Sequence, residues 1–225
     1  MSQTRIAFIA LAVVLAGAGI YAILRPGSGP APAIAPTEVT AAPEAAPESE
    51  PLAPGADLGL RIEVAGEANG TITVDLFEDV APGHAAQIAA LAREGAYDNV
   101  VFHRVIDGFM AQTGDVEFGR TDAEDFDMRR AGMGGSALPD LEAEFSEIPF
   151  DRGVVGMARS QDPDSANSQF FIMFAPGHFL NNQYTVVGRV TDGMEVVDAI
   201  KRGDQNANGA VLGEPDRMVD VTVTE

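Results

Sequence analysis

The chain has 225 residues, 46% of them hydrophobic, which is enough for one well-buried domain plus an appendage. Its 34 acidic and 14 basic residues give a formal net charge of -20, so nucleic-acid phosphates would repel the chain and nucleic-acid binding is disfavoured. Because cysteine is absent, disulfides and thiolate zinc sites are excluded.

The first 25 residues, 1–25, have the character of a targeting segment. An apolar run without a charged residue covers residues 6–24, and about 20 apolar residues are enough for a helix to span a bilayer. The run therefore predicts an N-terminal hydrophobic helix that anchors the chain in a membrane. A cleaved signal peptide is the alternative, with Arg5 as its basic start and Ala16-Gly17-Ala18 as its cleavage site. Both interpretations send the rest of the chain across that membrane.

Residues 26–57 are rich in proline, alanine and glutamate. Eight of the chain's 14 prolines fall within 26–54. Such a composition cannot bury enough apolar surface to offset the chain entropy lost on folding, and it favours extended conformations. We expect a disordered linker here, followed by a folded domain at 58–225.

The folded domain is expected to open with an antiparallel pair of strands. Apolar and polar residues alternate over 60–64 and again over 71–76. Between them lies Asn69-Gly70, which is a strong signal for a tight hairpin turn.

Two helices are expected. The first begins near Pro82, a residue that the first helical turn tolerates, and Gly95 can end it. The second covers about 194–202, with Asp192 and Glu195 as a capping-box-like start and Gly203 as its stop. The apolar residues expected to face the core are Ile88, Leu91 and Ala92 in the first helix and Val197 and Ile200 in the second.

Short apolar segments fill the remainder and predict strands at 100–102, 109–112, 154–157, 170–173, 185–190 and 219–223. About eight strands with two helices are typical of an antiparallel barrel capped by helices. Spacing alone also permits a sandwich.

Two motifs carry the chemistry: FHRVIDGFMAQTGD at 102–115 and SANSQFFIMF at 165–174. They combine a guanidinium, two amides and large apolar side chains without an assembled nucleophile and base. In order and spacing they resemble the cyclophilin family of peptidyl-prolyl cis-trans isomerases, over about 59–225. The resemblance selects a mainly β fold, a closed eight-stranded antiparallel barrel capped by two α-helices. It also implies that the chain catalyses rotation about X-Pro peptide bonds.

The resemblance assigns roles to particular residues. Arg104 matches the family's catalytic arginine, and Gln112 matches the glutamine that positions this arginine and the substrate backbone. A guanidinium that is always charged can donate to the prolyl nitrogen, whose lone pair becomes available only as the amide twists. The expected substrate-binding residues are the proline pocket of Phe109, Met110, Phe171, Phe179 and Leu180, the main-chain groove of Ala158, Arg159 and Gln169, and Tyr184.

Three positions depart from the pattern of many relatives. Phe179 replaces a tryptophan and so removes an indole donor, which predicts weak binding of cyclosporin. Arg159 takes the place of a commoner asparagine, but peptide binding should survive because the family uses mainly the backbone of that residue. Tyr184 falls where many relatives carry histidine, and its hydroxyl could donate to a substrate carbonyl.

Two further features invite a functional interpretation. His103 adjoins Arg104, yet strand alternation points it to the opposite face, so a structural role is favoured over that of a general base. Residues 204–209, DQNANG, reproduce the first half of an EF-hand calcium loop, but the twelfth position is Pro215 instead of glutamate. A polar turn is therefore favoured over a calcium site, and no metal or other cofactor is expected.

The leading hypothesis is a peptidyl-prolyl isomerase that assists the folding of exported proteins and acts on proline-containing, unfolded or flexible polypeptides. We expect a monomer on the periplasmic side of an inner membrane, held through residues 6–24 if they are uncleaved, or soluble in the periplasm otherwise. The alternative is a membrane-tethered module that binds proline peptides, or a chaperone, with incidental turnover. Retention of both Arg104 and Gln112 favours the enzyme.

Overall fold

The computed structural model describes residues 58–225. The expected membrane segment at 1–25 and the linker at 26–57 lie outside the described residues. Among the residues that are described, no helix combines the length and the apolar character needed to cross a membrane.

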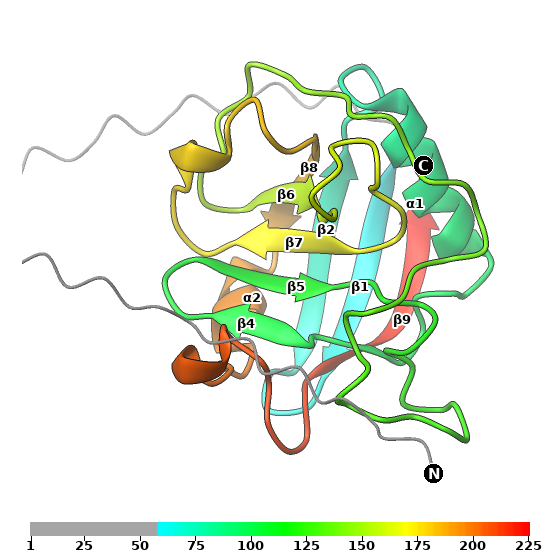
Figure 1. Cartoon of the computed structure of the whole chain (residues 1–225), viewed down its shortest axis with the longest axis vertical. Coiled ribbons are helices and arrows are strands. Elements are labelled where there is room, and N and C mark those ends of the chain that lie inside the picture. The colour runs from blue at the N-terminus through cyan, green and yellow to red at the C-terminus, as the bar shows by residue number, and fades with distance from the viewer. Residues whose placement is uncertain (1–57) are drawn as a thin grey trace, which may run out of the picture. The chain divides into compact units, whose positions relative to one another are not determined.

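One antiparallel sheet of nine strands forms the framework of the domain, in the order β3-β9-β1-β2-β8-β6-β7-β5-β4. The sheet is curled, and in Figure 1 strands β4, β5 and β7 run across the direction of β1, β2 and β9. The strands are β1 (Gly59–Ala65), β2 (Gly70–Leu76), β3 (Val100–Val101), β4 (Arg104–Ile106), β5 (Met110–Thr113), β6 (Val154–Met157), β7 (Phe170–Met173), β8 (Val186–Asp192) and β9 (Arg217–Thr224).

The expectation of a closed eight-stranded barrel is met only in part. The fold is mainly β and curled, but it has nine strands, and among residues 58–225 no ladder joins the edge strands β3 and β4. A short piece of chain connects the two edge strands instead of a ladder. β3 pairs with β9, and after only Phe102 and His103 the same stretch continues as β4 and pairs with β5. The chain itself therefore leads from one edge of the sheet to the other.

The predicted N-terminal hairpin is confirmed. β1 and β2 pair antiparallel with Ile62 opposite Ile72, and both side chains are fully buried. In the turn, the Asn69 side-chain amide donates to the Gly66 carbonyl at 2.9 Å. This local hydrogen bond explains why an asparagine suits the turn.

Helix α1 (Pro82–Arg93) also forms as predicted. Pro82 lies in its first turn, and Ile88, Leu91 and Ala92 are buried. The helix packs against β9 and β1. Just beyond its end, Gly95 adopts a left-handed conformation with φ of 66°, which a glycine accommodates without a Cβ clash.

The prediction for the second helix is right at its first residue, but it is wrong about the cap and about the end. α2 (Met194–Ala199) is shorter than 194–202, and the left-handed Gly193 begins it without a side-chain cap from Asp192 or Glu195. It ends early because Ile200 leaves the helical conformation and buries its side chain. The next backbone N–H, that of Lys201, donates to the buried Asp216 carboxylate at 2.7 Å. Tertiary contacts therefore override the stop signal at Gly203.

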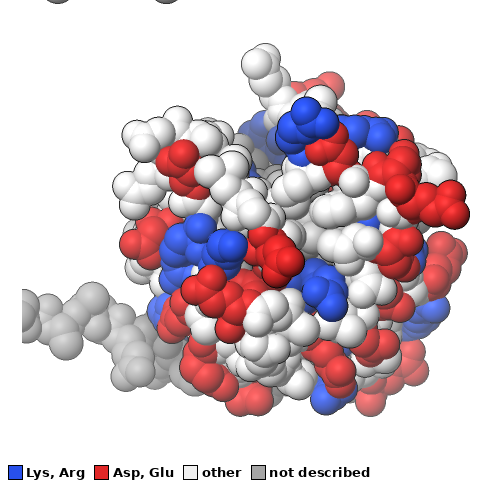
Figure 2. Space-filling model, turned by 90° about the horizontal axis from the view of Figure 1, so that it is seen from below, with Lys and Arg blue, Asp and Glu red and all other residues white. Residues whose placement is uncertain are grey.

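Two single-turn 3-10 helices complete the fold: η1 (His178–Leu180) and η2 (Gln205–Ala207). Acidic and basic side chains are interspersed over the face of the domain seen in Figure 2. The excess of acid is therefore spread over this face and does not gather into one patch.

Candidate active site

One pocket brings together nearly all the predicted site residues. Its volume is about 260 Å³, and its walls come from β4, β5, β7 and η1, from the residue before β5 and from the loops that follow β6 and η1. A second, adjoining pocket of about 490 Å³ shares Gln112, Ala158 and Arg159 with it and includes Gln169. The lining residues of the first pocket are Arg104, Phe109, Met110, Gln112, Ala158, Arg159, Phe171, Phe179, Leu180 and Tyr184.

The apolar part of the first pocket has a buried floor and an open rim. Met110, Phe171 and Leu180 are buried, so their positions are fixed by packing. At the rim, the rings of Phe109 and Phe179 lie 5.4 Å apart, and Phe179 is 66% exposed. An apolar group of modest size can thus enter past Phe179 and rest on a rigid apolar surface.

Arg104 projects from the edge strand β4 and is held from two sides. Its Nη1 donates to Gln112 Oε1 at 3.2 Å, across the β4 and β5 pairing. On the other side, Nε donates to the Asn208 carbonyl at 3.0 Å and Nη2 donates to Asn208 Oδ1 at 3.1 Å. Partial burial lowers the pKa of the guanidinium, but an arginine remains charged at neutral pH.

A chain of amides continues inward from Arg104. Gln112 Nε2 donates to Gln169 Oε1 at 3.0 Å, and Gln169 Nε2 donates to the carbonyls of Gly132 and Gly134 at 3.1 and 2.7 Å. Because each amide uses its oxygen on one side and its nitrogen on the other, the orientation of Gln112 is defined. The predicted positioning role of Gln112 therefore has a geometric basis.

Asp115 supports the far end of this row of amides, and the sequence pattern had indicated no role for it. It is fully buried, and its carboxylate accepts from the backbone N–H groups of Glu117, Phe118, Gly132 and Gly134. The signal that could have found it is its place at the end of the first motif, directly after a glycine. Its carboxylate folds the segment from Gly132 to Gly134 against Gln169.

Arg159 and Tyr184, two of the unusual residues, contact each other. The guanidinium carbon of Arg159 lies 4.4 Å from the centre of the Tyr184 ring, and its Nε and Nη2 donate to the Gln183 carbonyl. The Tyr184 ring meets Phe171 edge-on at 5.9 Å. The Arg159 side chain therefore forms part of the pocket wall, in addition to the main-chain role that the sequence suggested.

His103 lies behind the site and does not line the pocket. It is buried, and a Cβ built on Gly132 would come within 2.6 Å of its ring, so the ring packs directly on that glycine. Burial lowers the pKa of His103 to about 4. A neutral imidazole facing away from the pocket agrees with the structural role predicted for it.

The DQNANG loop contributes to the site through Asn208. The Asn208 side-chain oxygen, which the EF-hand pattern would direct at calcium, accepts from Arg104. Within residues 58–225, no group of three or more histidine, aspartate or glutamate side chains is arranged to hold a metal ion.

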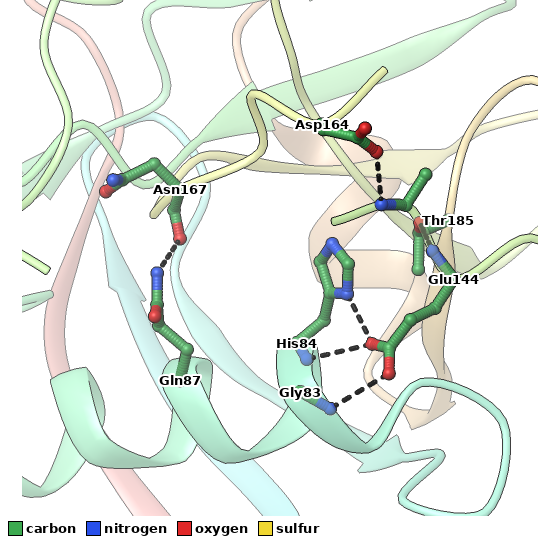
Figure 3. A network of polar contacts seen from close by, with 8 residues as sticks. Gly83, His84, Gln87, Glu144, Asp164, Asn167 and Thr185 are labelled. Carbon is green, nitrogen blue, oxygen red and sulfur yellow. Dashed lines mark hydrogen bonds and ion pairs between the residues drawn. The ribbon is translucent and has the colours of Figure 1, made fainter. Parts of the chain in front are cut away.

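A polar network around Glu144 joins its segment to the start of α1 and to Thr185, the residue before β8 (Figure 3). The backbone N–H groups of Gly83 and His84 donate to the Glu144 carboxylate, each at 3.1 Å, and Nδ1 of the buried His84 lies 2.5 Å from Glu144 Oε2. The Glu144 N–H donates to Thr185 Oγ1. Burial works against the charged form of Glu144, but the hydrogen bonds from His84 and Gly83 outweigh it and lower its pKa.

The sequence profile described as cyclophilin type peptidyl-prolyl cis-trans isomerase/CLD matches residues 60–223, which is most of the chain. The chain belongs to this family. A relative from Brucella suis with the name "Probable peptidyl-prolyl cis-trans isomerase" is 61% identical over 155 residues, covering 69% of this chain and 78% of the relative. The enzyme class of this cyclophilin domain is therefore peptidyl-prolyl cis-trans isomerase.

Solved structures agree with the assignment. The cyclophilin AquaCyp293 from Hirschia baltica is 26% identical, with a TM-score of 0.59 and coverage of 74% of this chain and 73% of that one. A cyclophilin-type isomerase from Cryptosporidium parvum is also 26% identical, with a TM-score of 0.61 and coverage of 74% and 97%. The latter has also been crystallised in the presence of the dipeptide Ala-Pro.

Proposed function

We propose that the 260 Å³ pocket holds the proline ring of a substrate and that Arg104 catalyses rotation about the peptide bond that precedes it. The observation that carries this proposal is the clamped guanidinium at the rim of an apolar pocket. The pocket positions the ring, and the guanidinium meets the nitrogen next to it.

Catalysis of this rotation requires little more than a positioned proline ring and a donor at its nitrogen. Rotation about a peptide bond costs about 18–20 kcal/mol because resonance between nitrogen and carbonyl is lost. In the twisted state the nitrogen lone pair is no longer delocalised and can accept a hydrogen bond. A donor fixed at that nitrogen therefore stabilises the transition state more than either planar ground state, which is the condition for catalysis. No proton has to be transferred.

The other residues hold the two ends of the substrate. Met110, Phe171 and Leu180 form a rigid apolar floor that keeps the proline ring still, while the residue before the proline swings. Gln112 orients Arg104, and the backbone of Ala158 and Arg159 borders both pockets, where an extended peptide can lie. The Ala-Pro dipeptide present with the Cryptosporidium cyclophilin supports a proline-containing ligand.

Substitution of Arg104 by alanine tests the mechanism. Loss of a charge-assisted donor in a shielded site should lower kcat roughly 10²–10³-fold, while ground-state affinity for a proline peptide changes little. Isomerisation would be followed by NMR exchange on the domain at 58–225, with peptide affinity from calorimetry. A folded Arg104→Ala protein that turns over at the wild-type rate would contradict the proposal and favour a binding module.

We also propose that the full chain acts as a monomer on the periplasmic side of an inner membrane and assists the folding of exported proteins. The uncharged apolar run at 6–24 supports the location. Fractionation of tagged full-length protein with N-terminal sequencing tests the location. Soluble protein beginning near residue 19 would exclude the anchor, and cytoplasmic protein would exclude both the anchor and the signal peptide.

A further inference from the structure

The loop that follows α2 is attached to the edge of β4, the strand that carries Arg104. The Val105 N–H donates to the Gly209 carbonyl at 2.8 Å, and the Gly203 N–H donates to the Val105 carbonyl at 2.9 Å. Further on, the Val211 N–H donates to the His103 carbonyl at 3.1 Å. Residues 203–211 therefore follow β4 closely, and any side chain at the turn of this loop is placed beside Arg104.

The shape of the loop is set by its own residues. The Asp204 side chain accepts from the Asn206 N–H at 2.8 Å and caps η2. Asn208 and Gly209 both adopt left-handed conformations, with φ of 54° and 80°. Asparagine and glycine are the residues that tolerate such φ values best, and a Cβ on Gly209 would overlap Ile106. The pattern that resembles half of a calcium loop thus encodes a tight turn that presents Asn208.

Asn208 uses two oxygens on one edge of the Arg104 guanidinium. Its carbonyl accepts from Nε at 3.0 Å and its side-chain Oδ1 accepts from Nη2 at 3.1 Å. A guanidinium has five N–H donors in a fixed planar fork. With Nη1 donating to Gln112 and lying 4.0 Å from Met110 Sδ, the plane of the fork is defined by acceptors on both sides, and an N–H donor on Nη2 remains for a substrate.

We propose that Asn208 is a positioning residue for the isomerase reaction, which it supports by holding the Arg104 guanidinium in the plane that meets the prolyl nitrogen. This inference rests on the catalytic role proposed for Arg104. Without Asn208, only Nη1 would be held, by Gln112 and by a long contact to Met110 Sδ. The guanidinium could then rotate about that one nitrogen, and its ordering would have to be repeated in every catalytic cycle. Because Asn208 is neutral, it orients the cation without cancelling its charge.

Substitution of Asn208 by glycine is the sharpest test, because glycine keeps the left-handed backbone and the carbonyl contact to Nε and removes only Oδ1. We expect kcat to fall about 10-fold to 100-fold with KM nearly unchanged. In Arg-selective NMR spectra, the Nη protons of Arg104, held apart in the wild type, should exchange faster. Asn99→Gly is the matched control, since Asn99 is also left-handed, with φ of 62°, and does not line either pocket.

Combining Asn208→Gly with Arg104→Ala distinguishes a positioning role of Asn208 from a general loss of structure. If Asn208 acts only through Arg104, then Asn208→Gly should change the rate of an Arg104→Ala protein by less than about twofold. A wild-type rate in Asn208→Gly, or the same loss in both backgrounds, would overturn the inference. If Arg104→Ala itself keeps the wild-type rate, the proposed function fails first, and the two failures are thereby distinguished.

Discussion

Two arginines line the proposed proline pocket, and the fold uses them differently. Arg104 is held by the side chains of Gln112 and Asn208 together with one carbonyl. Arg159 binds backbone carbonyls only, those of Ser160, Gln161 and Gln183, and its guanidinium covers the face of Tyr184. Among residues 58–225, neither arginine forms a salt bridge with a carboxylate.

The difference shows how one residue type serves two purposes. The stacked Arg159 has its flat face covered by an aromatic ring, so it acts as part of the wall. Arg104 is fixed at its edges by neutral acceptors, so its charge remains available to a substrate. We therefore propose that the Arg104 side of the pocket serves catalysis and that the Arg159 side gives the pocket its shape.

Substitution of Arg104 and of Arg159 by lysine should give the largest difference in kcat between the two sides of the pocket. Arg104→Lys replaces an oriented fork by a point charge on a flexible stem, so we expect kcat to fall roughly 10²-fold or more. Arg159→Lys loses the stacked wall but keeps the main-chain groove, so kcat should stay within about threefold of the wild type. Steady-state kinetics on one proline peptide would compare the two. Equal losses would remove the distinction between the two sides.

Acid should lower the stability of the folded domain through His103, the residue beside Arg104, which is buried with a pKa lowered to about 4. An unfolded histidine titrates near 6.5, so between these values the unfolded state binds more protons. Stability should therefore fall as the pH drops from about 6.5 to 4, by up to about 3 kcal/mol from this group.

Urea unfolding across that pH window, with His103→Phe for comparison, measures the effect, because the variant lacks only this imidazole. The variant should show a shallower loss of stability. Equal slopes would contradict the prediction. If the variant does not fold, an NMR titration that protonates His103 of the wild-type domain near pH 6.5 would contradict it as well.

The smallest expected effect concerns cyclosporin and the exposed rim. Phe179 offers no donor, so inhibition should be weak, and Phe179→Trp should tighten it by about tenfold if the indole N–H gains one hydrogen bond. Phe179→Tyr, which keeps an aromatic ring but places its donor differently, is the control. An inhibition constant that does not change in Phe179→Trp would show that another part of the pocket limits affinity.

Much of the fold could be predicted because it is encoded locally. The strands β6 and β7 fall at the predicted residues, and α1 begins and packs as expected. The end of α2 could not be predicted, since it depends on Asp216, which follows in the chain after a loop. The short β4 was not recognised as a strand, because three residues give too little alternation to read.

In the candidate site, too, some features could be predicted from the sequence and others depend on contacts between distant residues. The family resemblance that the two motifs carry supplied the list of expected site residues, and the structure brings nearly all of them together in one pocket. Asn208 was overlooked because its contact with Arg104 joins positions 104 residues apart, and its loop was interpreted as a weak calcium pattern. The stacking of Arg159 on Tyr184 was missed for a similar reason, since each residue was weighed as a separate departure from the family.

The cap on α1 has a consequence for the order of folding. The helix has no side-chain cap of its own and no acidic residue in its first turn, so its first N–H groups rely on Glu144, about sixty positions away. Such a distant partner arrives only after a long loop has closed. We therefore expect stabilisation by Glu144 to come after the main folding barrier, so that its loss speeds unfolding more than it slows folding.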